Sequence, residues 1–229
     1  MSRLRLMLVC GSLALAGCGA GDEPDATTTG PGRPTSGLRY GVIGDSYSNG
    51  EALGIQFAWP TLLAQRLGLD VVVNPAVSGY SSANALEEEL PQFRAAKPEV
   101  ASLMIGTNDL VQGVPASTFH LRFRRLLRAM VEIVGGPRRV LVVTTPDFSF
   151  KPAAAQFGDP AEISRGVTAV NRIVRQEAAA QKVRVVSITA VSRDAQDSAP
   201  DGLHPSAREL RAWTDVIEPV AREAWAGLR

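Results

Sequence analysis

From residue 38 onward the chain alternates short apolar runs with longer segments in which apolar residues recur every three to four positions. The short runs predict strands over residues 38–43, 71–73, 100–105, 140–143 and 183–188. The longer segments predict helices over residues 57–67, 82–96, 117–134, 161–180 and 206–226. Strands that alternate with helices favour right-handed crossovers and a parallel sheet with helices on both faces. We therefore expect an α/β domain, a three-layer α/β/α sandwich with about five parallel strands.

Three details support this interpretation. Residues 71–73 are consecutive valines, which is typical of a strand covered on both faces. Gly68 stands where the C-cap of the preceding helix should be. Trp213 and Trp225 have helical spacing in the last helix and are expected to face the core.

The first 18 residues have the pattern of a signal peptide. Two arginines are followed by an apolar segment over residues 6–16, which is too short to span a bilayer. Residues 15–18, Leu-Ala-Gly-Cys, resemble the bacterial lipobox, and this resemblance implies lipid attachment at Cys18 and an extracytoplasmic lipoprotein held to the membrane. The alternative is a plain cleaved signal and a secreted soluble protein. Residues 19–37, rich in Gly, Pro, Thr, Ser and Asp, then predict a flexible tether before the domain of residues 38–229.

Composition excludes several kinds of site. The formal net charge of +1 and the pI of about 7.8 lack the basic character of a nucleic-acid-binding protein. Both cysteines, Cys10 and Cys18, lie in the leader, so we expect no disulfide and no thiol nucleophile in the domain. With only His120 and His204 as further soft ligands, we expect no metal site, and no motif calls for a cofactor.

Polar, glycine-bearing motifs follow four of the five predicted strands. They are residues 44–46 (Gly-Asp-Ser), 74–79 (Asn-Pro-Ala-Val-Ser-Gly), 106–109 (Gly-Thr-Asn-Asp) and 201–205 (Asp-Gly-Leu-His-Pro). In open α/β sheets, functional groups gather beyond the carboxyl ends of the strands. We therefore expect these four motifs to meet at one edge of the sheet.

Ser46 requires a base to act as a nucleophile. His120 lies within a predicted helix and is interpreted as structural. His204 follows Asp201 by three residues, so one turn can direct the carboxylate to the imidazole. The segment from residue 189 to 200 can extend about 40 Å, against the roughly 15 Å needed to cross three strand spacings.

A serine nucleophile also requires donors for the oxyanion that forms during acyl transfer. The backbone N–H groups of Ser46 and Gly79 and the side-chain amide of Asn108 are the candidates. Taken singly, Gly79 and Asn108 are equally compatible with ordinary turns. Their order after successive strands favours a shared role.

The four motifs together resemble the blocks of the GDSL or SGNH hydrolases, over residues 38 to about 226. The resemblance implies a flavodoxin-like sheet, no metal, Ser46 as nucleophile, His204 as base, Asp201 as orienting acid, and an oxyanion hole of Ser46, Gly79 and Asn108. Residues 59–60 (Trp-Pro) and Asn74 look like the thioesterase, lysophospholipase and arylesterase subgroup. Thr107 departs from the glycine frequent there and is expected to narrow the wall beside Asn108.

We therefore expect a serine esterase that hydrolyses small or medium acyl esters, of the carboxylester, lysophospholipid or thioester type, through an acyl-enzyme. The alternatives are a carbohydrate O-acetyl esterase and a non-catalytic lipoprotein that binds a glycan or lipid. The G-x-S-x-G elbow of α/β-hydrolases and the glycine motifs of nucleotide-binding domains are absent from the sequence. From position alone, Tyr47 and residues 148–150 are expected to line an acyl pocket.

Overall fold

Five parallel strands form one sheet in the order β2-β1-β3-β4-β5 in the computed structural model, which describes residues 37–194 and 198–228. The strands are β1 Arg39–Ile43, β2 Asp70–Val73, β3 Val100–Leu103, β4 Val140–Val143 and β5 Arg184–Val186. After β2 the chain crosses to the other side of β1, so β1 lies between β2 and β3. Such a reversal of strand order opens a crevice at the carboxyl ends of the strands, and the polar motif after β1 is placed there.

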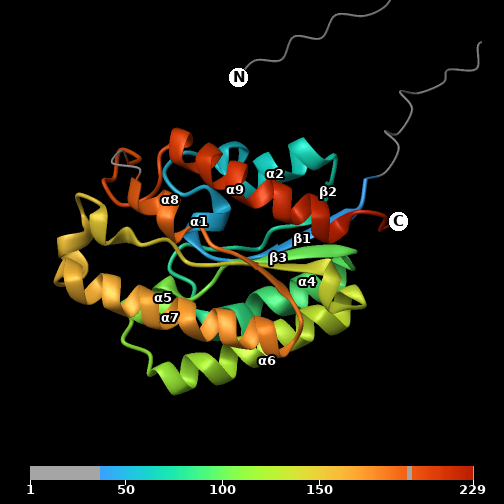
Figure 1. Ribbon diagram of the computed structural model, residues 1–229, viewed down its shortest axis with the longest axis horizontal. Helices are drawn as coiled ribbons and strands as arrows, with labels where there is room; N and C mark the ends of the chain where they lie inside the picture. Colours follow the sequence, from blue (N-terminus) through green and yellow to red (C-terminus); the bar gives the residue numbers. More distant parts are fainter. Residues whose placement is uncertain (1–36, 195–197, 229) are drawn as a thin grey trace, which may run out of the picture. The chain divides into compact units, whose positions relative to one another are not determined.

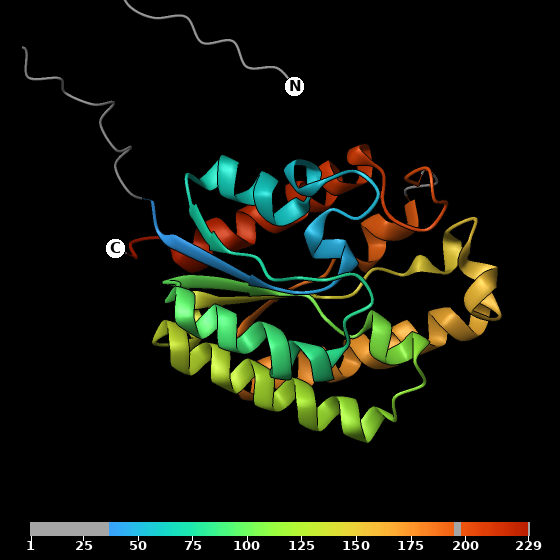
Figure 2. The ribbon, with the colours of Figure 1, turned by 180° about the vertical axis from the view of Figure 1, so that it is seen from behind.

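Helices cover both faces of this sheet (Figures 1 and 2). On one side lie α2 Trp59–Leu67, α8 Thr189–Asp194 and α9 Ala207–Trp225. On the other lie α4 Leu90–Ala96, α5 Thr107–Val111, α6 Ala116–Val134 and α7 Pro160–Ala180. The shorter pieces are α1 Ser46–Asn49, α3 Ser82–Asn84, the π-helix Ala85–Glu89, and the 3₁₀ turns Ile55–Phe57, Pro137–Arg139, Phe148–Phe150 and Ala154–Phe157. No helix in the described ranges is both long and apolar enough to cross a membrane.

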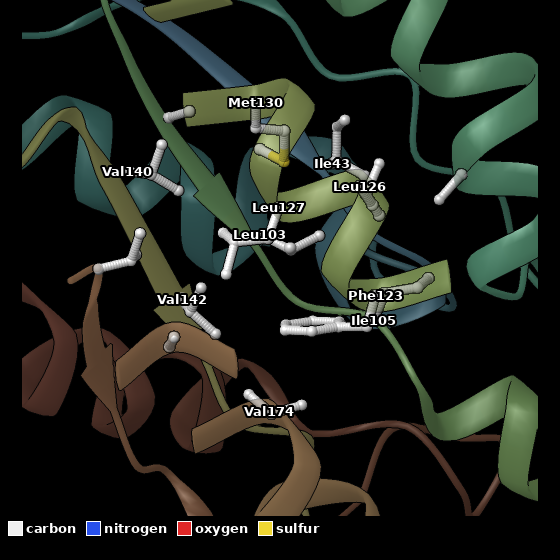
Figure 3. Close-up of a cluster of buried hydrophobic side chains, with 14 of the residues drawn as sticks. Ile43, Leu103, Ile105, Phe123, Leu126, Leu127, Met130, Val140, Val142 and Val174 are labelled. Carbon is white, nitrogen blue, oxygen red and sulfur yellow. The ribbon is translucent and has the colours of Figure 1, made fainter. Parts of the chain in front are cut away.

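Two hydrophobic cores lie on opposite faces of the sheet because side chains alternate along each strand. In β1, Tyr40 and Val42 pack into the core beneath α2 and α9, whereas Ile43 packs into the other. Figure 3 shows the second core, in which Ile43 and Leu103 of the sheet meet Phe123 and other side chains of α6. Because both faces are buried, the register of the strands is fixed, and so is the position at which each strand ends.

The predicted three-layer α/β/α fold with five parallel strands is confirmed. Gly68 ends α2 with a φ of 65°, and Trp213 and Trp225 are buried, as expected. The expectation that the valine strand is covered on both faces is wrong: β2 is an edge strand, and Val71 is 40% exposed. Residues 1–36, with Cys18 and nearly all of the predicted tether, lie outside the described residues.

Candidate active site

A sharp turn places Ser46 at the carboxyl end of β1. A Cβ on Gly44 would lie 2.3 Å from Ser48 Oγ, so only glycine permits this turn. Asp45 caps α1, with its Oδ1 accepting from the Tyr47 N–H at 3.1 Å. Ser46 is therefore the first residue of α1, and it is 8% exposed at the wall of a cavity.

That cavity, of about 200 Å³, brings together Ser46, Gly79, Asn108 and His204. These four residues come from the segments that follow β1, β2, β3 and β5. The remaining lining residues are Tyr47, Glu51, Ser78, Thr107, Val111, Phe148, Phe157 and Leu203. All four polar motifs found in the sequence thus lie at the same edge of the sheet, and their predicted site residues line one cavity, with Asp201 directly behind His204.

Asp201 makes three hydrogen bonds within its own turn, one of them to the imidazole of His204. Its Oδ2 lies 2.5 Å from His204 Nδ1, while its Oδ1 accepts from the backbone N–H groups of Leu203 and His204 at 2.9 and 3.0 Å. Partial burial opposes ionisation of Asp201, but these hydrogen bonds outweigh it and lower the pKa of the carboxyl. An ionised Asp201 holds the proton of His204 on Nδ1 and leaves Nε2 as the nitrogen that can serve as a base.

Tyr47 places the His204 ring next to the serine turn. Its ring centroid lies 5.5 Å from that of His204 and 5.9 Å from that of Trp213. Burial, and then the negative charges of Asp45, Glu209 and Asp201, raise the pKa of Tyr47 well above its usual range. Tyr47 therefore remains a neutral spacer between the core and the imidazole.

The loop after β2 is tied to the serine helix by two side-chain amides. Asn74 Nδ2 donates to the carbonyl of Ser48 at 2.9 Å, and Asn49 Nδ2 donates to Ser78 Oγ at 3.1 Å. Gly79 follows with a φ of +83°, a conformation that other residues adopt only with strain. Sequence analysis noted Asn74 only as a feature of the resemblance, and the structure gives it this positioning contact.

The turn after β3 is tied to the same loop. Asn108 Nδ2 donates to the Tyr80 carbonyl at 3.0 Å, so one of its two amide hydrogens holds the side chain and the second remains for a ligand. Next to it, Asp109 accepts from the backbone N–H of Ser82 at 2.8 Å and from its hydroxyl at 2.5 Å. Donors fixed in this way need little reorganisation when charge develops.

The histidine loop has a buried support that sequence analysis did not find. Lys151 and Glu209 form an ion pair with side-chain exposures of 3% and 0%. Two residues after Lys151, the N–H of Ala153 donates to the Gly202 carbonyl at 3.0 Å, within the 201–204 turn. The pair links the segment after β4 to α9, which starts just beyond His204.

Two predictions about individual side chains have opposite outcomes. Phe148 lines the cavity as expected, whereas Phe150 is 57% exposed, lies beside Arg193 and is not among the lining residues. Phe157, which sequence analysis did not single out, lines the cavity instead. His120 lies on α6 and pairs with Glu177 of α7, as a structural role requires.

Comparisons with known proteins agree with this geometry. A model of the "GDSL-like Lipase/Acylhydrolase family" matches residues 42–208. An arylesterase of Vibrio mimicus is 27% identical over 189 residues, which cover 80% of this chain and 86% of the relative. The crystal structure of TesA, 23% identical, superposes with a TM-score of 0.64 over 81% of this chain and 99% of TesA. The acetylxylan esterase Axe2 of Geobacillus stearothermophilus, 20% identical, gives a TM-score of 0.62 over 83% and 95%.

Proposed function

The chain belongs to the GDSL-like lipase/acylhydrolase family and is a serine esterase, and we propose that it cleaves small or medium acyl esters through an acyl-enzyme at Ser46. One observation carries this proposal: Ser46, His204, Gly79 and Asn108 line the same cavity, and Asp201 holds His204 from behind. A nucleophile, an oriented base and oxyanion donors are the parts that acyl transfer requires.

In the first half of the reaction, Ser46 Oγ attacks the carbonyl carbon of the ester and its proton passes to His204 Nε2. The negative oxygen is held by the N–H groups of Ser46 and Gly79 and by the free amide hydrogen of Asn108. Asp201 stabilises the imidazolium that forms. The bond to the alcohol then breaks, and His204 gives its proton to the leaving oxygen.

In the second half, water takes the place of the alcohol. His204 Nε2 removes a proton from the water, whose oxygen attacks the acyl carbon. The bond to Ser46 Oγ breaks, and the serine recovers its proton from His204. A carboxylic acid leaves, and the enzyme returns to its starting state.

The apolar side of the cavity suits the acyl chain. Val111, Phe148 and Phe157 line it, and the same three residues also line a second cavity of about 140 Å³ with Leu110 and Ile163. Each methylene buried there would contribute about 0.8 kcal/mol. The adjoining cavities thus favour acyl groups longer than acetyl.

The charges at the cavities favour an uncharged leaving group. Glu51 lines the first cavity, where the bond to the leaving group breaks. No lysine or arginine is among the described lining residues of either cavity. Anionic leaving groups, such as the phosphate-bearing ones of lysophospholipids and many thioesters, would meet the Glu51 carboxylate with no lysine or arginine of the described lining to offset it. We therefore rank neutral carboxylesters first among the three ester types.

A substrate panel tests the proposal. p-Nitrophenyl esters of graded acyl length, a lysophospholipid, an acyl thioester and acetylated sugars would be compared on the wild-type enzyme. We expect kcat/KM to rise from acetate to medium chains and to be lowest for anionic leaving groups. A preference for acetylated sugars would favour the second candidate, a carbohydrate O-acetyl esterase, for which the polar rim of Glu51 and Ser78 is the supporting feature.

Covalent labelling separates catalysis from mere binding. A fluorophosphonate probe should label the wild type at Ser46 and leave Ser46→Ala unlabelled, with both proteins folded. His204→Ala should lose hydrolysis of p-nitrophenyl acetate. An unreactive wild type would instead support the non-catalytic lipoprotein that binds a glycan or lipid.

We also propose that Cys18 carries a lipid anchor, on the resemblance of residues 15–18 to a lipobox. Metabolic labelling with a fatty-acid analogue should mark the wild type and not Cys18→Ala. Label on neither protein would leave the plain secreted form as the correct one, and label on both would place the acyl chain at a residue other than Cys18.

A further inference from the structure

Three carboxyl groups are buried around the turn that carries Ser46. Asp45 and Glu89 are 0% exposed and Asp109 is 1% exposed. Asp109 is satisfied by the N–H and hydroxyl of Ser82. Asp45 Oδ2 and Glu89 Oε1, by contrast, are buried without a hydrogen-bond partner. Each of the two acids near the serine therefore has one carboxyl oxygen satisfied by a backbone N–H and one oxygen buried without a donor.

Glu89 reaches this position through an irregular helix. It is the last residue of the π-helix Ala85–Glu89, where the N–H of Leu90 donates to the carbonyl of Ala85, five residues back. A π turn adds one residue to a helix and redirects the side chain at its end. The other oxygen of Glu89, Oε2, accepts from the N–H of Gly44 at 3.0 Å. Glu89 thus holds the backbone at the end of β1, two residues before Ser46.

Among the described residues, the charged groups that act on Asp45 and Glu89 are other acids. Asp109 acts on Asp45 from α5, while Asp45 and the adjacent Glu88 act on Glu89. No ion pair among the described residues joins any of the three buried carboxyls to a lysine, arginine or histidine. Burial, and then the neighbouring negative charges, raise the pKa of Asp45 to about 7 and that of Glu89 to about 8.

We propose that Glu89 is a positioning residue of the serine turn that works as the neutral acid, and that Asp45 and Glu89 together carry at most one negative charge in the active enzyme. As a neutral acid, Glu89 accepts the hydrogen bond from the Gly44 N–H without electrostatic repulsion from Asp45. When both acids ionise, two uncompensated charges lie behind the serine, and the turn moves to separate or hydrate them. The inference rests on the proposed role of Ser46, and it predicts an alkaline limit to activity that Glu89 sets.

Glu89→Gln tests this directly, because glutamine keeps an oxygen for the Gly44 N–H and cannot ionise. Glu87→Gln, at an exposed position of the same π-helix, is the matched control. In a pH profile on a neutral ester, kcat of the wild type and of Glu87→Gln should fall above about pH 8, whereas Glu89→Gln should keep its activity about one pH unit further. At pH 7 the three should agree within roughly threefold. Coincident alkaline limbs for the wild type and Glu89→Gln would overturn the proposal.

A measurement without catalysis separates this inference from the proposed function. In wild-type protein labelled with ¹³C at glutamate carboxyls, the Glu89 signal, assigned by its absence from Glu89→Gln, should titrate near pH 8. Titration near the ordinary value of about 4.3 refutes a neutral Glu89 whether or not the enzyme turns over. Failure of Ser46 to react with fluorophosphonate, together with a titration near pH 8, would refute the proposed function alone. If Glu89→Gln does not fold, Glu89→Asp assigns the signal instead, because it also removes the labelled glutamate at this position.

Discussion

Asp201 Oδ2 and His204 Nδ1 lie 2.5 Å apart within a single turn of four residues. The backbone of the same turn also contributes, because the N–H groups of Leu203 and His204 bind the other carboxylate oxygen. The backbone of the turn therefore holds the carboxylate in position independently of its contact with the imidazole. The orientation of the base depends on one short loop rather than on two separate elements.

Asp201→Asn should lower kcat by up to about 10⁴ while leaving the fold intact, as the equivalent change does in a serine protease. Asparagine keeps the size of the side chain but carries no charge to stabilise the imidazolium. Its amide NH2 would donate to Nδ1 and hold the imidazole in the wrong tautomer. Steady-state kinetics on p-nitrophenyl esters, with circular dichroism as the control for folding, measure the effect. A loss below tenfold would mean that Asp201 does not orient the base.

Gly79→Ala should destabilise the protein by about 1–2 kcal/mol and lower kcat by ~10²–10³, because a φ of +83° strains alanine and displaces the N–H that faces the oxyanion. Gly68→Ala is a matched control: its φ is +65°, neither glycine has an atom within 4 Å of an added Cβ, and Gly68 lies outside the cavity. Thermal denaturation should show similar losses for the two variants, and kinetics should show a loss only for Gly79→Ala. Equal kinetics would remove Gly79 from the oxyanion hole.

Phe157→Ala should lower kcat/KM for medium-chain esters by roughly tenfold and leave acetate esters within twofold, because Phe157 lines both adjoining cavities. Phe150→Ala is the control, since that ring belongs to the same segment and lines neither cavity. The measurement is a series of p-nitrophenyl esters of increasing chain length. A uniform loss at every length would argue against an acyl-binding role.

Lys151→Met should destabilise the protein by about 3–5 kcal/mol, because it removes one side of a buried ion pair. The double variant Lys151→Met, Glu209→Leu should recover most of this loss, since it replaces both charges with apolar groups. Urea denaturation gives the free energies of unfolding. A double variant as unstable as the single one would show that the two side chains do not act as a pair.

Sequence alone predicted that the five proposed site residues lie at one edge of the sheet, because the carboxyl ends of parallel strands meet there. Ser46, Gly79 and Asn108 each follow a strand within a few residues. The end of the predicted strand therefore fixes approximately where each of them lies. His204 follows a longer connection, yet its spacing from Asp201 is local and therefore visible in the sequence.

Helices α5 and α8 were missed because they are too short to show a clear apolar period. The other features that the sequence did not reveal depend on packing between distant segments. Glu89 reads as one of three consecutive glutamates, and only the π turn distinguishes it as the buried one. Likewise, Lys151 and Glu209 are ordinary charged residues until the fold buries them against each other. The valines of β2 give no sign of the edge position, because strand order is a property of the whole sheet.

In the sequence, Ser46 lies near the start of the domain and His204 near its end. Helix α9, which follows His204, packs on α2, which follows Ser46. The proposed catalytic pair can therefore meet only after nearly the whole chain has been synthesised and the last helix has docked. Any fragment that ends before α9 should be inert. Turnover of a chromogenic ester consequently reports completion of folding, and its recovery after dilution from denaturant would time the final step of assembly.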